Sequence, residues 1–583
     1  MRGAEFAEEV RRGRSFEGAT IAGFDLRSER LVGAKLAKTK LAKLWLQGAD
    51  LSGADLRGAQ LVECPLEGAN LEGCNLENAL LLQADLRGAR LRGANLAGAK
   101  LINANLTGAD LEGCDLSGTA LVGARLDGAR FKGAKLFETL LNQASLVGAD
   151  LAEIGISRVV FTRANLTRAV LRGASIEESV LLEAKLHAAD LGGATLDRVS
   201  LTKADLRGAT LPKSMTKTVF DKTAFGPMPL QDKDLSDASV DGADFSGLDL
   251  SGVSFSRSSL RGVSFKGANL RGANFEGTSF TECDLSGADL RDAVVRQTTF
   301  VQSVVRDVDL SNRDLHTVSF TECDLSGVDC TASRIQMSAF AETNLTGAKL
   351  TRARIEQAVF HKAVLDGALV EKTVFYRVAF HATDLRKLTL AGANAQKCTF
   401  IEANLDGMDL SKSDFSQSSF AKASLKATNL DDCVLDKASF TEANMELAKL
   451  ERTKARHCYF GDAILKRTNF SKAKLRSSLF VQSDLSDALL YDCDLRMATL
   501  TGTNAQRALF INADLAYANL SHADLRGADF SGANLDFTNL HAAREEGTKW
   551  GGSLAATTRR TDMDRLEAEN WHPPARPSSR ESR

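Results

Sequence analysis

Phenylalanine recurs at a fixed interval of twenty residues through the middle of this chain. The chain has 583 residues and 29 phenylalanines, and eleven of these occupy every twentieth position in unbroken succession: Phe280, Phe300, Phe320, Phe340, Phe360, Phe380, Phe400, Phe420, Phe440, Phe460 and Phe480. Such regularity predicts that the backbone returns to the same place after each twenty residues. We therefore expect a solenoid with a ladder of stacked phenylalanine rings in its interior.

A shorter period of five residues runs inside the period of twenty. Every fifth residue from Phe16 to Leu211 is Leu, Ile or Phe, and nearly every fifth residue from Phe220 to Leu540 is Leu or Phe. We call these residues the centres. The residue two places before a centre is usually Ala, and otherwise mostly Ser, Thr, Val or Cys. Both positions are small or apolar, so we expect both to point inward.

A period of five fits neither the 3.6-residue repeat of an amphipathic helix nor the two-residue alternation of an open strand. It fits a chain that turns a corner every five residues, with three residues of each five facing outward. Gly often lies two places after the centre, as Gly93 does after Leu91, where a tight turn benefits from its conformational freedom. Four corners close one coil, and coils stack by strand-like hydrogen bonds at about 4.8 Å. These features predict an all-β solenoid.

The repeated unit has the consensus A(D/N)LxG, as in Ala49-Asp50-Leu51, Ala104-Asn105-Leu106 and Ala533-Asn534-Leu535. In tandem, this motif resembles the pentapeptide repeat proteins from about residue 16 to 540. The resemblance implies a right-handed quadrilateral β-helix. At four centres a coil, the chain would form about 26 coils.

The five-residue register breaks once, because Leu211 and Phe220 are nine residues apart and proline follows Leu211 directly. Proline interrupts both helices and strands. We therefore expect two solenoid segments, joined by either a kinked continuation or a loop that lets them pack at an angle. The predicted domains are an N-terminal cap (1–15), a first β-helix segment (16–211), a junction (212–234), a second β-helix segment (235–540), and a C-terminal cap with a flexible tail (541–583).

Both ends of a solenoid expose an apolar cross-section that must be covered. Phe6 and Val10 have helical spacing and predict a short capping helix. At the other end, Trp550 is a candidate lid and residues 561–571 a candidate helix, in which Asp564 would complete a weak capping box. Residues 575–583 contain mainly Pro, Ser and Arg and predict a flexible tail.

Cysteine and histidine occupy opposite parts of the repeat. Nine of the ten cysteines lie two places before a centre and Cys330 is itself a centre, so we interpret them as small core residues rather than metal ligands or disulfides. Most histidines lie outside. His361 and His381 are twenty residues apart and should stack, which could form a metal-binding or pH-sensitive pair, but two imidazoles without a third ligand make a weak site. We expect no metal site and no cofactor.

Composition restricts the class of protein. The net charge is −2, which favours neither a nucleic-acid-binding protein nor a polyanion mimic. No run of apolar residues is long enough for a membrane span, and the first thirty residues contain no recognisable secretory signal. Catalytic motifs are absent from the sequence. We expect a non-enzymatic, cytoplasmic protein, with export by a signal-independent secretion system left open.

The outward positions are where a partner would bind. From position 352 to position 472, seven residues recur at intervals of twenty, each two places after a centre. Five of the seven are basic. This predicted basic column repels itself and could receive an acidic partner, although turn positions also accept any soluble residue. Its members, our candidate partner-binding residues, are Arg352, Lys372, Lys412, Arg452 and Lys472.

Together these observations predict a rigid, non-catalytic scaffold or adaptor that binds protein partners, and neither nucleic acid nor membrane. Its oligomeric state is open, including an end-to-end dimer. The family resemblance implies two settings. Some members accompany bacterial secretion systems, including contractile, type VI-like injection machinery, which we favour. Others mimic DNA and inhibit or protect DNA gyrase; the near-neutral charge departs from that pattern, so we keep this as the alternative.

Overall fold

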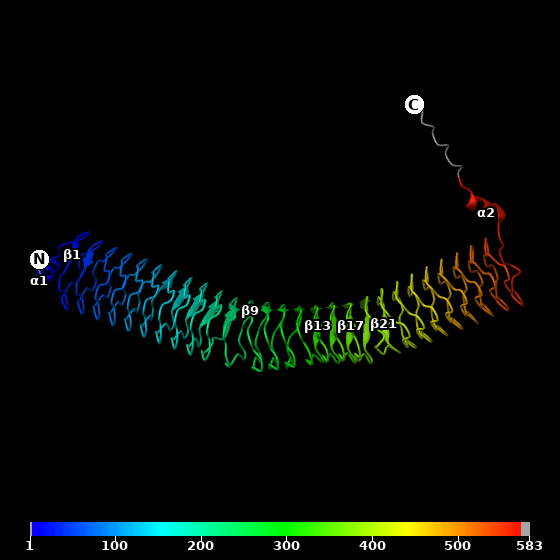
Figure 1. Ribbon diagram of the computed structural model, residues 1–583, viewed down its shortest axis with the longest axis horizontal. Helices are drawn as coiled ribbons and strands as arrows, with labels where there is room; N and C mark the ends of the chain where they lie inside the picture. The colour runs from blue at the N-terminus through cyan, green and yellow to red at the C-terminus, as the bar shows by residue number, and fades with distance from the viewer. Residues whose placement is uncertain (1–2, 573–583) are drawn as a thin grey trace, which may run out of the picture. The chain divides into compact units, whose positions relative to one another are not determined.

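The computed structural model describes residues 3–572. It divides into two compact units, the first ending at Val304 and the second beginning at Val305. Each unit is a parallel β-solenoid in which every coil lies beside the next (Figure 1). Neither of the two helices among the described residues is long and apolar enough to cross a bilayer.

One repeat shows how the sequence builds a coil. Ala49 and Leu51 are buried, whereas Asp50 between them faces outward and is partly exposed. Asp50 pairs with Asn70 in parallel register. The Leu51 N–H donates to the Asn70 carbonyl and the Asn70 N–H to the Ala49 carbonyl, both at 2.8 Å. The twenty-residue coil is therefore set by backbone hydrogen bonds and by a buried centre on each side.

The corners are tight turns closed by a bond from the residue three places after a centre, as from the Ala54 N–H to the Leu51 carbonyl at 2.9 Å. The residue two places after the centre has a left-handed backbone, with φ of 66° at Gly53. Many coils place a larger residue there, including Lys412 with φ of 61°. Non-glycine residues are less favourable in this region by roughly 1 kcal/mol, so coil stacking must compensate.

Strands are short because each side of the coil has room for about three residues. The first unit contains helix α1 (Gly3–Arg11). Its strands are β1 (Thr20–Ala22), β2 (Lys40–Ala42), β3 (Leu136–Phe137), β4 (Gly155–Ser157), β5 (Ser175–Glu177), β6 (Thr195–Asp197), β7 (Ser214–Thr216), β8 (Val219–Asp221), β9 (Ser239–Asp241), β10 (Ser259–Arg261), β11 (Ser279–Thr281) and β12 (Thr299–Val301).

The second unit ends with helix α2 (Met563–Asn570). Its strands are β13 (Asp314–His316), β14 (Ser319–Thr321), β15 (Arg334–Gln336), β16 (Ala339–Ala341), β17 (Arg354–Glu356), β18 (Val359–His361), β19 (Val374–Tyr376), β20 (Ala379–His381) and β21 (Asn394–Gln396). Odd-numbered β13 to β21 pair along one side and even-numbered β14 to β20 along another. These strands pair in parallel and join residues twenty apart.

The register break of the sequence is a single short step in the first unit. Strand β7 pairs with β6 at an offset of nineteen residues, Thr195 with Ser214, and the offset returns to twenty between β8 and β9. Met215 is fully buried as a centre only four residues after Leu211. Parallel pairing between neighbouring coils thus continues through residues 212–234.

The phenylalanine ladder lies in the core. In the second unit, successive rings from Phe320 to Phe480 stack with centroids 4.7–5.3 Å apart and planes within 18°. In the first unit, Phe280 and Phe300 stack at 4.6 Å. Offset stacking of this kind adds to the burial of each ring.

The two ends are closed differently. At the first end, α1 buries Phe6, Ala7 and Val10, with the Phe6 ring 4.7 Å from that of Phe16. Phe6 thus belongs to the capping helix. At the other end, the coil continues past Leu540, with Asn539 paired to Arg559.

In this last coil, the sequence pattern is lost although the backbone repeats. Trp550 takes a centre position, and its ring stacks on that of Phe530 at 4.8 Å. The Arg560 guanidinium lies over Trp550 and also pairs with Glu545. Helix α2 is capped by Asp562, which accepts the Arg565 N–H at 3.1 Å. The flexible tail expected for 575–583 lies outside the described residues.

Candidate partner-binding surface

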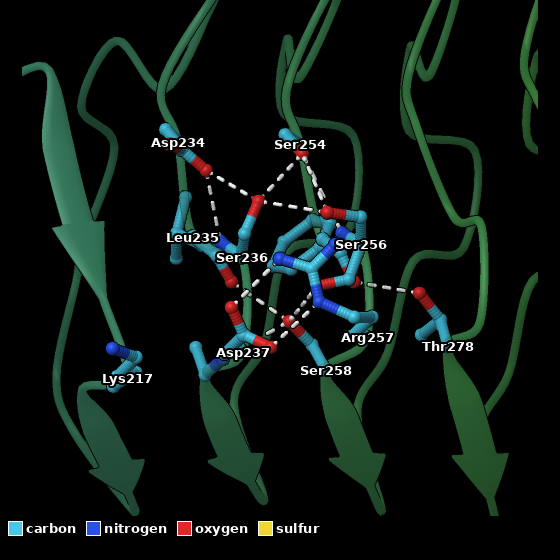
Figure 2. Close-up of polar contacts among 12 residues, drawn as sticks. Lys217, Asp234, Leu235, Ser236, Asp237, Ser254, Ser256, Arg257, Ser258 and Thr278 are labelled. Atoms are coloured by element: carbon cyan, nitrogen blue, oxygen red, sulfur yellow. Dashed lines mark hydrogen bonds and ion pairs between the residues drawn. The ribbon is translucent and has the colours of Figure 1, made fainter.

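Outward residues on neighbouring coils form columns, and polar side chains pair along them. In the first unit, Arg257 donates to both carboxylate oxygens of Asp237 one coil before, at 2.9 and 2.8 Å (Figure 2). The inward Ser258 instead donates to the Leu235 carbonyl at 2.7 Å. Inward polar groups are thus satisfied by backbone, while outward groups are available to each other and to a partner.

The basic column predicted from the sequence lies in the second unit. Its five members, Arg352, Lys372, Lys412, Arg452 and Lys472, are all exposed, and their φ values of 56–61° place each at a left-handed corner. Four of the five corners, those at Arg352, Lys412, Arg452 and Lys472, donate a backbone N–H to the following coil, as from the Arg452 N–H to the Ser471 carbonyl at 3.0 Å. The five residues therefore occupy equivalent exposed corners of the solenoid.

The chain itself offsets much of the repulsion in this column. Arg452 donates to both oxygens of Asp432 on the preceding coil, at 2.9 and 3.0 Å. This pairing holds the pKa of the Asp432 carboxyl below its usual range. Gly392 separates Lys372 from Lys412. A partner is therefore not required to explain why basic residues stack here.

A denser group of cations surrounds the last two members of the basic column, and most of its residues lie outside that column. On one side of the solenoid, two successive coils carry a basic residue at each of the three outward positions, and Lys454 pairs in parallel register with Lys474. All six side chains are exposed. We call this group the cationic patch: Arg452, Lys454, Arg456, Lys472, Lys474 and Arg476.

Most of the cationic patch is not neutralised. Arg452 and Arg456 pair with Asp432 and Asp436 on the preceding coil, the latter at 2.6 Å. Within residues 3–572, Lys454, Lys472 and Lys474 form no ion pair. Arg476 makes its contact with the sulfur of Met497 at 3.7 Å. The signal in the sequence was present, since Arg-Thr-Lys-Ala-Arg at 452–456 recurs as Lys-Ala-Lys-Leu-Arg at 472–476.

The histidine pair predicted from the sequence is brought together. His361 and His381 stack with ring centroids 5.0 Å apart, and their Nδ1 atoms are separated by 2.9 Å. At that distance one Nδ1–H donates to the other Nδ1, so the neutral pair shares a hydrogen bond. This use of both Nδ1 atoms explains the contact without a metal.

A second histidine cluster holds helix α2 against the last coils. The Nε2 atoms of His522 and His541 lie 3.1 and 3.2 Å from the same oxygen of Glu569. The Asp562 N–H donates to His541 Nδ1 at 3.1 Å. His541 must therefore carry its ring proton on Nε2. A histidine bound to metal through Nε2 normally donates from Nδ1, so this arrangement suits a hydrogen-bonded clasp better than a metal site.

All ten cysteines are buried and free. Burial raises the pKa of the Cys64 thiol to about 11 and that of the Cys330 thiol to about 12. Thiols with such pKa values are almost entirely protonated at neutral pH, so they are poor nucleophiles and poor metal ligands. Their positions agree with the interpretation of cysteine as a core residue.

The fold and its surface define a class, the quadrilateral parallel β-helix built from five-residue steps. Models of pentapeptide repeats match more than half of the chain, at residues 34–73, 66–108, 104–143, 134–181, 180–214, 230–267, 258–297, 338–375, 468–504 and 508–544. A related pentapeptide repeat region matches residues 373–450 and 393–470. The chain belongs to the pentapeptide repeat family.

Solved structures of pentapeptide repeat proteins are similar to parts of the chain. HetL of Nostoc sp. strain PCC 7120 is 22% identical, covering 45% of this chain and 91% of its own, with a TM-score of 0.13. Rfr23 from Cyanothece 51142 is 32% identical, covering 17% of this chain and 64% of its own, with a TM-score of 0.12. Full-length QnrB1, a plasmid-mediated fluoroquinolone resistance protein, is 17% identical, covering 47% of this chain and 92% of its own, with a TM-score of 0.12. The comparison with curated proteins gave no match.

Proposed function

We propose that this protein is a non-catalytic scaffold that binds protein partners through its outward columns. The observation that carries the proposal is that each five-residue repeat separates core residues from surface residues. Two residues pack into the core, and the other three form a regular exposed array over hundreds of residues. Repeat folds commonly use such extended surfaces for binding.

Side-chain chemistry supports a binding role over catalysis. The cysteines are buried, and burial raises the pKa of thiols such as that of Cys330. Glu569 is already occupied by three donors, His522, His541 and Arg565. Among the described residues, these features supply neither an activated nucleophile nor an available general base. We favour a secretion-associated setting for this scaffold, and the family resemblance is the basis for that choice.

Affinity capture tests the proposal. The full chain is immobilised and exposed to extract from its source cells, and captured proteins are identified by mass spectrometry. We expect at least one protein that, once purified, binds the purified chain at fixed stoichiometry in physiological salt. Hydrolysis or transfer of a small molecule by the purified chain, abolished by a point substitution, would contradict the proposal.

A gyrase supercoiling assay tests the alternative. A mimic of DNA needs a strongly negative surface, whereas this chain has a net charge of −2 and a cationic patch. We expect no inhibition of gyrase and no protection from quinolones when the chain is added in molar excess. Inhibition relieved by added DNA would overturn our preference and favour the alternative.

A further inference from the structure

We propose that the cationic patch docks a short acidic segment of a protein partner, bound in an extended conformation along the coils. The inference rests on the proposed scaffold function and names the site and the chemistry of the partner. Four exposed cations that form no ion pair with any other described residue, Lys454, Lys472, Lys474 and Arg476, provide the attraction.

The spacing of the patch matches an extended segment. Along each coil the basic residues occupy alternate positions, as in Lys472, Lys474 and Arg476. In an extended peptide, side chains on one face also recur at every second residue, about 6.6 Å apart. Lys474 lies on the straight side of its coil, with Lys472 and Arg476 in the turns on either side, so acidic residues at alternate positions would direct one carboxylate to the side and one toward each turn. The parallel pairing of Lys454 with Lys474 places a further cation about one coil spacing, roughly 4.8 Å, to the side.

Negative charges around the patch favour a short segment over nucleic acid. Asp432 and Asp436 lie on the preceding coil, and Asp492 and Asp494 lie on the following one. Glu451 adjoins the patch along its own coil and contacts Arg452 at 2.9 Å. A nucleic acid presents a long continuous row of phosphates and needs an extended basic surface. It would meet these carboxylates beyond two coils, whereas a short acidic segment ends within the patch.

An apolar contact next to the patch gives the partner a second feature. Tyr459 and Leu479 pair in parallel register and are 36% and 38% exposed. They lie three residues beyond Arg456 and Arg476 respectively, around the next corner. A large apolar residue a few positions from the acidic residues would cover them. Exposed ion pairs alone are weak, so this contact should slow dissociation while the charges speed association.

The test uses the full chain and a labelled peptide with aspartate at three alternate positions and leucine three residues after the last. Fluorescence anisotropy should show saturable binding that weakens as salt is added. Lys454→Glu, Lys472→Glu and Lys474→Glu together should raise Kd by about tenfold or more, a fold-change typical of charge reversal at a complementary surface. Tyr459→Ala should raise Kd by less and leave its salt dependence unchanged.

A matched control reverses the same number of exposed charges elsewhere in the second unit, outside both the cationic patch and the basic column, with Lys349→Glu, Lys362→Glu and Lys426→Glu. It should keep a Kd within about twofold of the parent. Equal weakening in both triple variants would overturn the inference, because the effect would then reflect net charge. Tighter binding of an oligothymidylate with the same number of charges would also overturn it.

The partner found by affinity capture separates this inference from the proposed function. If the partner binds the triple Lys→Glu variant at 454, 472 and 474 as tightly as the parent, the proposed docking site is wrong, whereas the scaffold function is still supported. Failure to capture any partner contradicts the scaffold function itself.

Discussion

Phe380→Ala is expected to lower the free energy of unfolding of the surrounding coils by about 3 to 5 kcal/mol. Phe380 is only 3% exposed, and its ring stacks at 5.2 Å on that of Phe360 and at 5.3 Å on that of Phe400. Truncation removes these two stacking contacts and the edge contact with Phe375, and it leaves a cavity that a stacked β-solenoid closes poorly. The coils are held mainly by their neighbours, so the loss should appear first as local opening.

Hydrogen exchange of backbone amides checks this expectation, since it measures the opening of individual segments. Exchange should accelerate in the coils around residue 380 before it changes in distant coils. Phe537→Ala is the control, because that ring is 43% exposed at a corner and should cost less than about 1 kcal/mol. Equal effects of the two substitutions would mean that the ladder does not stabilise the core.

Leu435→Asp should be at least as damaging, at about 3 to 5 kcal/mol, because it places an unpaired charge in the interior. Leu435 is completely buried, and its neighbour Val434 faces outward. Val434→Asp therefore makes the same chemical change one residue away, beside Lys454 on the next coil. We expect that control to change stability by less than about 1 kcal/mol.

Acid should relieve the cost of Leu435→Asp. Burial disfavours the charged form, so the introduced carboxyl has a higher pKa in the folded state than in the unfolded state, where it is about 3.9. The penalty is largest above the folded-state pKa and shrinks as the pH falls toward the unfolded-state value. Denaturant unfolding of both variants from pH 7 to 4 measures this trend. A penalty independent of pH would indicate a cause other than the buried charge.

The sequence predicted the fold class and the family because the constraint repeats in every coil. An error in register would turn an entire set of centres outward, so the pattern from Phe16 to Leu211 leaves little freedom. The same reasoning predicts the basic column, since residues twenty apart occupy equivalent corners of successive coils. Periodicity thus determines which column a residue belongs to.

Periodicity does not determine irregular steps or side-chain pairing. Met215 became a centre after a four-residue step, which the sequence registered only as a break before Phe220. The last coil forms although Glu545 and Arg560 occupy centre positions, because backbone pairing continues and the two charges neutralise each other. Neither outcome follows from the five-residue spacing alone.

The partner-binding surface was only partly visible for a similar reason. A single column was followed along the stack, whereas the cationic patch extends across neighbouring columns to Lys454 and Lys474. The pairing of Arg452 with Asp432 depends on how far each side chain reaches, which spacing alone does not reveal. The column therefore looked more uniformly basic than it is.

Counting reactive thiols in the native protein tests the central claim most directly. The five-residue register places all ten cysteines in the interior, nine of them two places before a centre, from Cys64 to Cys493. Burial raises the pKa of both end members, to about 11 for Cys64 and about 12 for Cys493. A dithiobis-nitrobenzoate assay at neutral pH should detect no thiol in the folded chain and ten after denaturation, whereas several thiols reacting at once in the folded chain would contradict the register.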